Sequence, residues 1–262
     1  MGQTLMFDRI LWGVTFFLHI GLVVLLMYRK NYRVFPFFFI YALLNFLQGI
    51  VLLETYRIWG FRSTVSMQIA WTAQGLVTLA RAAAVVEICH RILAKFSGIW
   101  ELAWRMLVAA VALISLYSWA VSRGSWPFAI LNLDRGLELV MASVIVLLFV
   151  FARYYEVVVE PAIRTLAIGF FLYSCFRVLN DTVLERWLHR YTTLWNLLDA
   201  LTFLATMLLW SWVFSRTQPR TTFEPELLPE NLYRRVVPEI NARLNMLNEQ
   251  LGYFWHTKGK KT

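Results

Sequence analysis

Seven long apolar stretches are the feature that most constrains how this chain can fold. Each has roughly 20 residues, the length that an α-helix needs to cross about 30 Å of hydrocarbon at 1.5 Å per residue. Inside a bilayer such a stretch must satisfy all its backbone polar groups internally, which a helix does. The predicted spans are residues 10–28, 34–55, 67–93, 104–122, 128–154, 163–184 and 193–215. The sequence therefore predicts an all-α, polytopic integral membrane protein, with a seven-helix transmembrane bundle in residues 1–215.

Composition agrees with a chain that folds in lipid. Of the 262 residues, 59% are hydrophobic and 16% are charged, whereas soluble domains have about 45–50% and about 25%. The formal net charge of +9 is explained by the positive-inside bias and by attraction to anionic headgroups. The lipid bilayer of the cell membrane, which in a prokaryote is the cytoplasmic membrane, is thus the predicted partner, and nucleic acid is not.

Several kinds of chemistry lack their sequence signals. Cys89 and Cys175 form no Cys-x-x-Cys pair, so neither a disulfide framework nor a thiolate metal site is expected. No lysine lies inside a predicted span, which excludes a retinal Schiff base, and no His-Glu-x-x-His, Gly-x-Ser-x-Gly or P-loop is present. We expect no metal, no cofactor and no enzymatic activity, although carboxylates in the spans could serve acid/base chemistry.

Basic residues between the spans predict the orientation. One set of loops carries Arg29, Lys30, Arg33, Arg91, Lys95, Arg153, Arg164, Arg216 and Arg220. The opposite loops carry arginines but no lysine, at Arg57, Arg62, Arg123, Arg186 and Arg190. Because cytoplasmic loops are enriched in Lys and Arg, this bias predicts the N-terminus outside and the C-terminus in the cytoplasm.

The C-terminal part of the chain has a different pattern. Residues 216–237 are polar and rich in proline, which predicts a linker, and residues 238–262 are predicted to form an amphipathic cytoplasmic helix with a basic end. Its apolar positions alternate in steps of three and four, the spacing of a coiled-coil seam: Val237, Ile240, Leu244, Leu247, Leu251 and Phe254. Three alternatives remain for this seam: pairing with itself or a partner protein, lying on the membrane face, or packing beneath the bundle.

Charged residues inside the apolar stretches are the candidate functional residues. With the predicted orientation Asp134, Arg135, Glu138 and Asp199 fall in the outer third of the membrane. Arg177 lies somewhat beyond the midplane and Asp181 one turn further out. Spacings of three and four let Asp134 and Arg135 each share a helix face with Glu138, and Arg177 with Asp181. Asp199 is expected to meet Arg177 or Arg135 across the bundle. The residues form either an outward-facing polar cavity for a small ligand or ion, or a set of salt bridges that fixes helix packing.

Arg81 is the most deeply placed charge. It shares a helix face with Gln74 and Thr78, which suggests a buried polar seam, and we expect it to pair with a carboxylate or with backbone carbonyls. Glu87 lies on a different face and is expected to meet His90 or Arg91.

These features favour a non-enzymatic seven-helix sensor or transducer, with an outward-facing polar pocket and a cytoplasmic tail that binds a partner or a second copy. The alternatives are a structural or assembly subunit of a membrane complex and a small-solute transporter. A transporter predicts polar residues through the whole membrane depth, whereas the inner half is apolar apart from Arg81 and Glu87. Helix number alone does not establish a function.

Overall fold

The computed structural model describes the backbone of residues 2–60, 63–94, 96–186, 192–216 and 242–251. Side chains are described for residues 13–60, 63–94, 96, 98–180, 197–216 and 242–251. All regular structure in these ranges is helical, and the elements are α1 (Gly2–Tyr28), the short 3-10 helix η1 (Asn31–Arg33), α2 (Pro36–Trp59), α3 (Thr64–Leu93), α4 (Ser97–Ser122), α5 (Trp126–Tyr154), α6 (Pro161–Arg186) and α7 (Thr192–Arg216). Residues 242–251 form a further helical segment, which we call the tail helix.

Within the described residues, five helices are long and apolar enough to cross a membrane. They are α2, α4, α5, the Pro161–Asn180 part of α6 and the Leu197–Arg216 part of α7. α1 contains a shorter apolar segment, Gly13–Tyr28, and α3 is not among the five. The structure thus supports a multi-pass helical membrane protein, while the count of seven spans stays a prediction.

Local sequence explains several helix ends. Pro36, Pro127 and Pro161 each lie in the first turn of a helix, where proline is tolerated because these backbone N–H groups have no partner within the helix. The Ser63 side chain caps α3 by accepting hydrogen bonds from the next backbone N–H groups. Gly60 ends α2 with a φ of 77°, a left-handed value that favours glycine.

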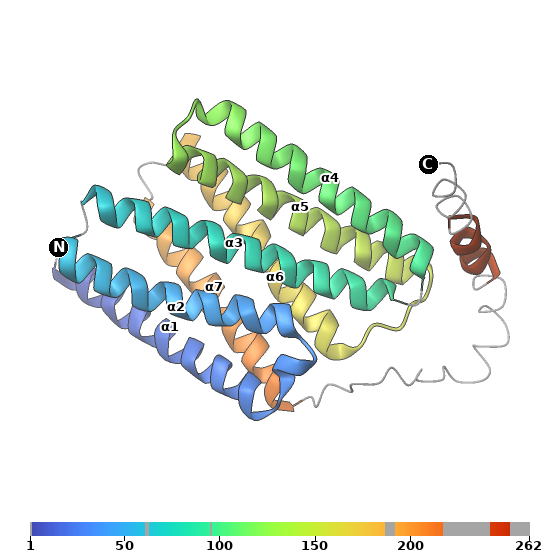
Figure 1. Ribbon diagram of the computed structural model, residues 1–262. Coiled ribbons are helices and arrows are strands. Elements are labelled where there is room, and N and C mark those ends of the chain that lie inside the picture. Colours follow the sequence, from blue (N-terminus) through green and yellow to red (C-terminus); the bar gives the residue numbers. More distant parts are fainter. Residues whose placement is uncertain (1, 61–62, 95, 187–191, 217–241, 252–262) are drawn as a thin grey trace.

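Six helices form a closed ring. α1 packs on α2, α2 on α3, α3 on α5, α5 on α6, α6 on α7, and α7 returns to α1 (Figure 1). α4 stands outside this ring and packs mainly on α5. Contact between α4 and α5 is close, because a Cβ atom at Gly136 would lie 2.6 Å from the Ile114 side chain.

The outward face of α4 is strongly apolar. Met106, Leu113, Leu116 and Trp119 are each more than 60% exposed. A surface of this kind is suited to contact with lipid, and it fits the assignment of α4 as a membrane-spanning helix.

Aromatic side chains fill the part of the ring near the end of α1 and the start of α2. This aromatic cluster consists of Phe35, Phe38, Tyr41, Phe170, Trp210 and Phe214, and each side chain is at most 1% exposed. Ring centroids of Phe38 and Trp210 are 5.1 Å apart, and those of Phe170 and Trp210 are 4.7 Å apart, within the range of favourable ring contacts. We call the part of the bundle that contains this cluster the aromatic half.

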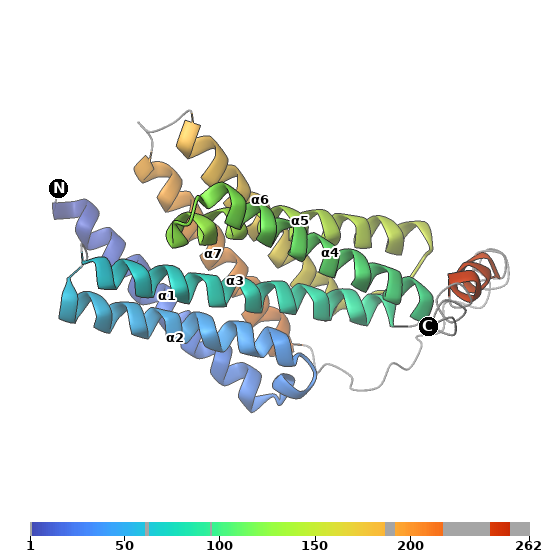
Figure 2. The ribbon, with the colours of Figure 1, turned by 45° about the horizontal axis from the view of Figure 1, so that its top comes forward.

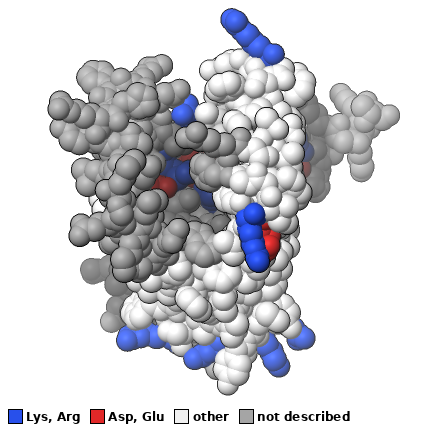
Figure 3. All heavy atoms as spheres, turned by 90° about the vertical axis from the view of Figure 1, so that its left-hand side faces the viewer, with Lys and Arg blue, Asp and Glu red and all other residues white. Residues whose placement is uncertain are grey.

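Exposed basic residues gather at the same end. Those at the adjoining helix ends are Arg29, Lys30, Arg33, Arg153, Arg164 and Arg216. Figure 3 shows Lys and Arg side chains along the lower edge of the molecule. This end is the one that the sequence predicts to be cytoplasmic.

Candidate functional site

A buried ion pair joins α3 to α5. Arg81 on α3 pairs with Glu138 on α5, and the two side chains are 2% and 1% exposed. The Arg81 guanidinium also lies over the rings of Tyr173, 4.8 Å from the centroid, and Tyr41, 5.7 Å from the centroid. A buried arginine requires such compensation because its desolvation is costly.

Asp134 lies one turn before Glu138 and accepts hydrogen bonds from two helices. The Thr78 hydroxyl and the Gln74 amide of α3 donate to its carboxylate over 2.5 Å and 3.4 Å, and Arg177 of α6 donates over 2.8 Å. Gln74, Thr78 and Arg81 are spaced by four and three residues, so they share the face of α3 that meets α5. The polar seam expected on α3 thus faces Asp134 and Glu138.

Arg177 extends this group of charges to α7. Its guanidinium lies between the carboxylates of Asp134 and Asp199, 2.8 Å from the first and 3.8 Å from the second. The side chains become more exposed from Asp134 towards α7: Asp134 is 3% exposed, Arg177 is 20% exposed and Asp199 is 25% exposed. We call Arg81, Glu138, Asp134, Arg177 and Asp199 the ion-pair network, and the part of the bundle that contains it the polar half.

Several of the charges meet across helices. We expected Arg135 beside Glu138, and Arg177 beside Asp181, from their spacings on one helix. In the structure Glu138 meets Arg81, and Arg177 meets Asp134 and Asp199. The predicted contact of Asp199 with Arg177 and the predicted carboxylate partner of Arg81 are thus confirmed. Arg135 is half-buried on α5, and the side chain of Asp181 lies outside the described residues.

A second polar contact lies in the aromatic half. The backbone N–H of Phe38 donates to the Glu87 carboxylate over 3.0 Å, and Arg91 lies 3.9 Å from the same side chain. Glu87 therefore caps the N-terminus of α2 from α3, where the helix leaves N–H groups unsatisfied and favours negative charge. The sequence suggested Arg91 as a partner but not the cap. The sequence held a hint of this cap. Phe35, the residue before α2, has no side-chain oxygen that could cap the helix, so another residue had to supply one.

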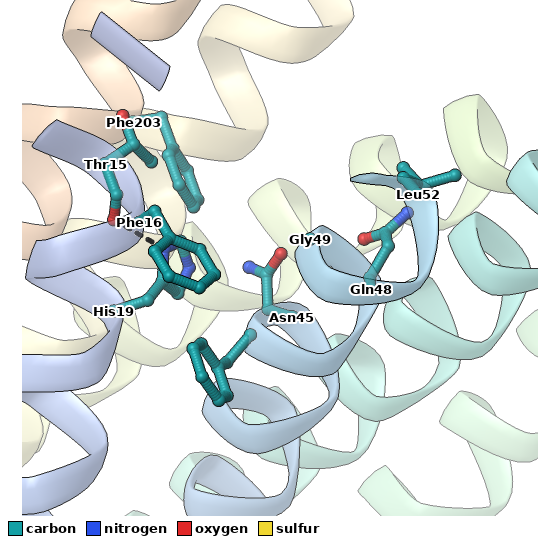
Figure 4. Close-up of a pocket in the computed structure, with 9 residues that line it drawn as sticks. Thr15, Phe16, His19, Asn45, Gln48, Gly49, Leu52 and Phe203 are labelled. Atoms are coloured by element: carbon teal, nitrogen blue, oxygen red, sulfur yellow. Dashed lines mark hydrogen bonds between the residues drawn. The ribbon is translucent and has the colours of Figure 1, made fainter. Parts of the chain in front are cut away.

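A pocket of about 240 Å³ lies between α1, α2 and α7, beside the network and not within it (Figure 4). Its apolar lining comes from Phe16, Phe46, Gly49, Leu52 and Phe203, and its polar lining from Thr15, His19, Asn45 and Gln48. Sequence reasoning missed this pocket. The signal for it was the pair Asn45 and Gln48, which lie three apart in an otherwise apolar stretch and so share a helix face.

Hydrogen bonds connect this pocket to the network. Gln48 in the pocket wall donates from its amide nitrogen to Gln74 over 3.2 Å, and Gln74 donates to Asp134. A second route runs from Asn45 to the Tyr41 hydroxyl over 3.3 Å, and the Tyr41 ring lies beneath Arg81. Pocket and network are thus parts of one polar system.

The tail helix lies beside the start of α4 (Figures 1 and 2). The Asn248 side-chain oxygen accepts a hydrogen bond of 2.6 Å from the backbone N–H of Gly98, in the first turn of α4. Leu244 is 1% exposed, whereas Leu247 is 42% exposed. Of the described seam positions, Leu244 is buried and Leu251 is half-buried, as is Asn248, whereas Leu247 faces away from this contact. Val237, Ile240 and Phe254 lie outside the described residues.

Neither metal ligands nor thiol pairs mark a further site in the described part of the chain. No group of three or more His, Cys, Asp or Glu side chains that could hold a metal ion occurs there. Cys89 is buried and Cys175 is half-buried, and both are free thiols.

Comparison with protein-family models, with curated proteins and with solved structures finds no match to this chain. Its class is therefore stated from its own geometry: a helical multi-pass membrane protein with a ring of helices around an ion-pair network. The function that this geometry supports best follows as a proposal.

Proposed function

We propose that this protein is a non-enzymatic membrane sensor or transducer. In this proposal seven helices span the membrane, the polar half faces outward and the tail helix lies in the cytoplasm. The observation that carries it is the continuous series of polar contacts from Gln48 in the pocket wall, through Gln74 and Asp134, to Arg177 and Asp199.

The network is suited to respond to a ligand because its partners come from different helices. Asp134 of α5, for example, accepts hydrogen bonds from both α3 and α6. Movement of either helix would therefore change the contacts of α5. A ligand shifts a conformational equilibrium only when it binds one arrangement better than another. A molecule in the pocket that rearranges Gln48 would act on this set of contacts directly.

The path to the tail helix runs through α5 and α4. α5 carries Asp134 and Glu138, and it is the main neighbour of α4. The start of α4 in turn holds the tail helix through Gly98 and Asn248. A shift of α5 would therefore reach the tail helix through two successive contacts, and the tail would present a changed surface to a cytoplasmic partner.

The aromatic half supports a sensor over a transporter. Fully buried rings of Phe38, Phe170 and Trp210 fill the centre of the ring of described helices on that side. A permeation pathway needs polar groups or an open cavity through the whole depth. The rings of the cluster pack closely at this depth, and the charged groups beside them, Glu87 and Arg91, are engaged with the start of α2 and with each other.

A structural or assembly subunit is the second candidate. It is favoured by the pairing of Arg81 with Glu138 and of Arg177 with two aspartates, because such pairs also serve to fix helix packing in membranes. The two candidates differ in whether a solute alters the tail helix.

The test uses the full chain in lipid nanodiscs. Cys89→Ala and Cys175→Ser remove the native thiols, and Leu247→Cys places an environment-sensitive dye on the exposed side of the tail helix. A panel of amino acids, organic acids, amines, sugars and phenols is added, and dye emission is recorded. We expect one solute class to give a saturable change, which Asp199→Asn abolishes and Glu101→Gln, in an exposed ion pair with Arg105 on α4, leaves intact.

Two other results would reject the sensor. Solute flux into proteoliposomes that depends on Asp199, with no change in the dye, would show a transporter. A silent dye with every solute, combined with a loss of folded protein in Asp134→Asn, would show a structural subunit.

A further inference from the structure

The pocket is lined by residues of α1 and α2, and Phe203 of α7 completes its wall. Figure 2 shows α1 diverging from α2 towards the end that carries the N-terminus. The pocket volume of about 240 Å³ lies below the range of about 300–1,000 Å³ that is typical for drug-sized ligands. The space therefore suits a small molecule.

His19 supplies an unsatisfied polar atom at this pocket. The side chain is 6% exposed, and its Nδ1 lies 2.9 Å from the Thr15 backbone carbonyl. Because a carbonyl can only accept, Nδ1 carries the hydrogen, and Nε2 of the neutral ring is then an acceptor. Nε2 is buried and has no hydrogen-bond partner among the described residues, a condition that calls for an explanation such as a bound molecule.

The opposite wall also offers acceptors. Figure 4 shows the amide of Asn45 between the His19 ring and Gln48. Asn45 donates from its amide nitrogen to Tyr41, and Gln48 donates from its amide nitrogen to Gln74. Each of these bonds uses an amide hydrogen, and both amide oxygens can still accept. Figure 4 shows the Asn45 nitrogen on the His19 side and the Asn45 oxygen on the Gln48 side.

The rest of the lining selects against ions and for an apolar body. Phe16, Phe46 and Phe203 contribute aromatic surface, and the Phe203 ring centroid is 5.3 Å from that of His19. No charged side chain occurs among the described residues that line the pocket. An ion without a countercharge would lose its hydration at high cost here, whereas an uncharged ring or short chain would not.

We propose that this pocket binds a small uncharged molecule with an apolar, preferably aromatic, body and a hydroxyl or N–H group that donates to His19 Nε2. The inference rests on the proposed function, since it names the ligand class of the same sensor. Two sources share this chemistry: an alcohol dissolved in the bilayer and a phenol that arrives from water.

Binding is measured directly, with no reading from the tail helix. The full chain in nanodiscs is titrated with 4-fluorophenol, and fluorine NMR line broadening is recorded against empty nanodiscs. The matched probe is 4-fluoroanisole, in which a methyl group replaces the donated hydrogen. We expect saturable binding of the phenol and at least about tenfold weaker binding of the anisole, because one buried hydrogen bond is lost.

The variant His19→Phe keeps a ring but removes the acceptor. We expect it to bind 4-fluorophenol about tenfold more weakly than the unmodified chain and to lose the preference over the anisole. His90→Phe is the matched control. His90 is exposed, lies in the last turn of α3 away from the pocket, and packs on Trp100 of α4. If His19→Phe does not fold, the difference in affinity between 4-fluorophenol and 4-fluoroanisole on the unmodified chain still tests whether the pocket requires a hydrogen-bond donor.

Addition of monoolein to the nanodiscs separates the two sources. Displacement of 4-fluorophenol by this hydroxylated lipid indicates a bilayer ligand, and retention indicates a water-borne one. Equal binding of both probes, absence of saturable binding, or unchanged binding in His19→Phe would overturn the inference. If the pocket binds 4-fluorophenol in preference to 4-fluoroanisole but the dye on the tail helix does not respond, the binding site is supported and the sensor function is rejected.

Discussion

The polar half and the aromatic half are built on the same helices but held together by different forces. In the polar half, Arg81 and Glu138 pair at 2% and 1% exposure, so stability there depends on matching charge. In the aromatic half, Phe38, Phe170 and Trp210 interlock at 0–1% exposure, so stability there depends on matching shape. Each half should therefore tolerate the kind of change that damages the other.

Charge and shape also differ in their specificity. A close-packed aromatic cluster has one good arrangement, because any displacement opens voids. A charged group can exchange partners when several lie within reach, as Arg177 has with Asp134 and Asp199. In the proposed sensor, the polar half would thus be the part of the bundle that changes state, and the aromatic half would keep the helices in register.

Removal of one member of the buried pair should have the largest effect. Arg81→Met leaves Glu138 buried without its partner, which should lower the free energy of unfolding by about 3–5 kcal/mol. The measurement is unfolding of the purified protein by SDS, followed by circular dichroism.

The double variant Arg81→Met with Glu138→Leu should recover most of this loss, because replacement of a whole buried pair by apolar groups is often neutral. Arg57→Gln is the control, since Arg57 and Glu54 form an exposed pair at 3.9 Å that should be worth less than about 1 kcal/mol. A double variant as unstable as the single one would show that the polar half depends on more than charge.

A change of volume should have the largest effect in the aromatic half. A Cβ atom at Gly169 would overlap the Trp210 indole, so Gly169→Ala should lower the free energy of unfolding by about 1–3 kcal/mol. The same SDS measurement applies, and Trp210→Phe in the Gly169→Ala background should relieve part of the loss.

Gly21→Ala is the matched control, because a Cβ atom at Gly21 would meet nothing within 4 Å. It should leave stability unchanged or raise it, since alanine is the better helix former. Equal effects at Gly169 and Gly21 would contradict the assignment of close packing to the aromatic half.

The smallest effect concerns the tail helix, which belongs to neither half. Asn248→Ala removes the acceptor for the Gly98 N–H, and loss of a helix cap costs about 1 kcal/mol. Hydrogen exchange at the first turn of α4 should therefore accelerate, while exchange in α3 and α5 stays unchanged. Asn245→Ala, at an exposed position of the same segment, should leave exchange in α4 unaltered.

The sequence indicated the helices more reliably than their ends. Apolar stretches revealed where a helix had to form, because backbone groups in lipid must be satisfied internally. Helix ends were less clear, since polar residues continue a helix beyond the hydrocarbon. α4, for example, begins at Ser97 and not at residue 104, and its N-cap residue Phe96 makes no side-chain cap hydrogen bond.

The candidate site was predictable in its residues and in part of its pairs. The expected contacts of Asp199 with Arg177 and of Arg81 with a carboxylate are present, whereas the contact of Arg177 with Asp134 was not foreseen. Spacing on one helix suggested contacts such as Arg177 with Asp181, and such contacts contribute only about 0.2–0.5 kcal/mol. The relative rotation of helices decides which charges meet across the bundle, and a single sequence does not encode it in any local pattern. The pocket at His19 likewise depends on how α1, α2 and α7 pack together, and the contact of the tail helix with Gly98 depends on how that helix lies beside α4.

The closed ring of helices also has a consequence for the order of assembly during synthesis. Arg81 and Glu138 belong to α3 and α5, so both are present once residue 154 has been made. The ring itself closes through the contact of α7 with α1, the latest and the earliest helices of the bundle to leave the ribosome. α1 can therefore pack on α7 only after nearly the whole bundle has been synthesised. The wall that Phe203 contributes to the His19 pocket is completed at the same late step.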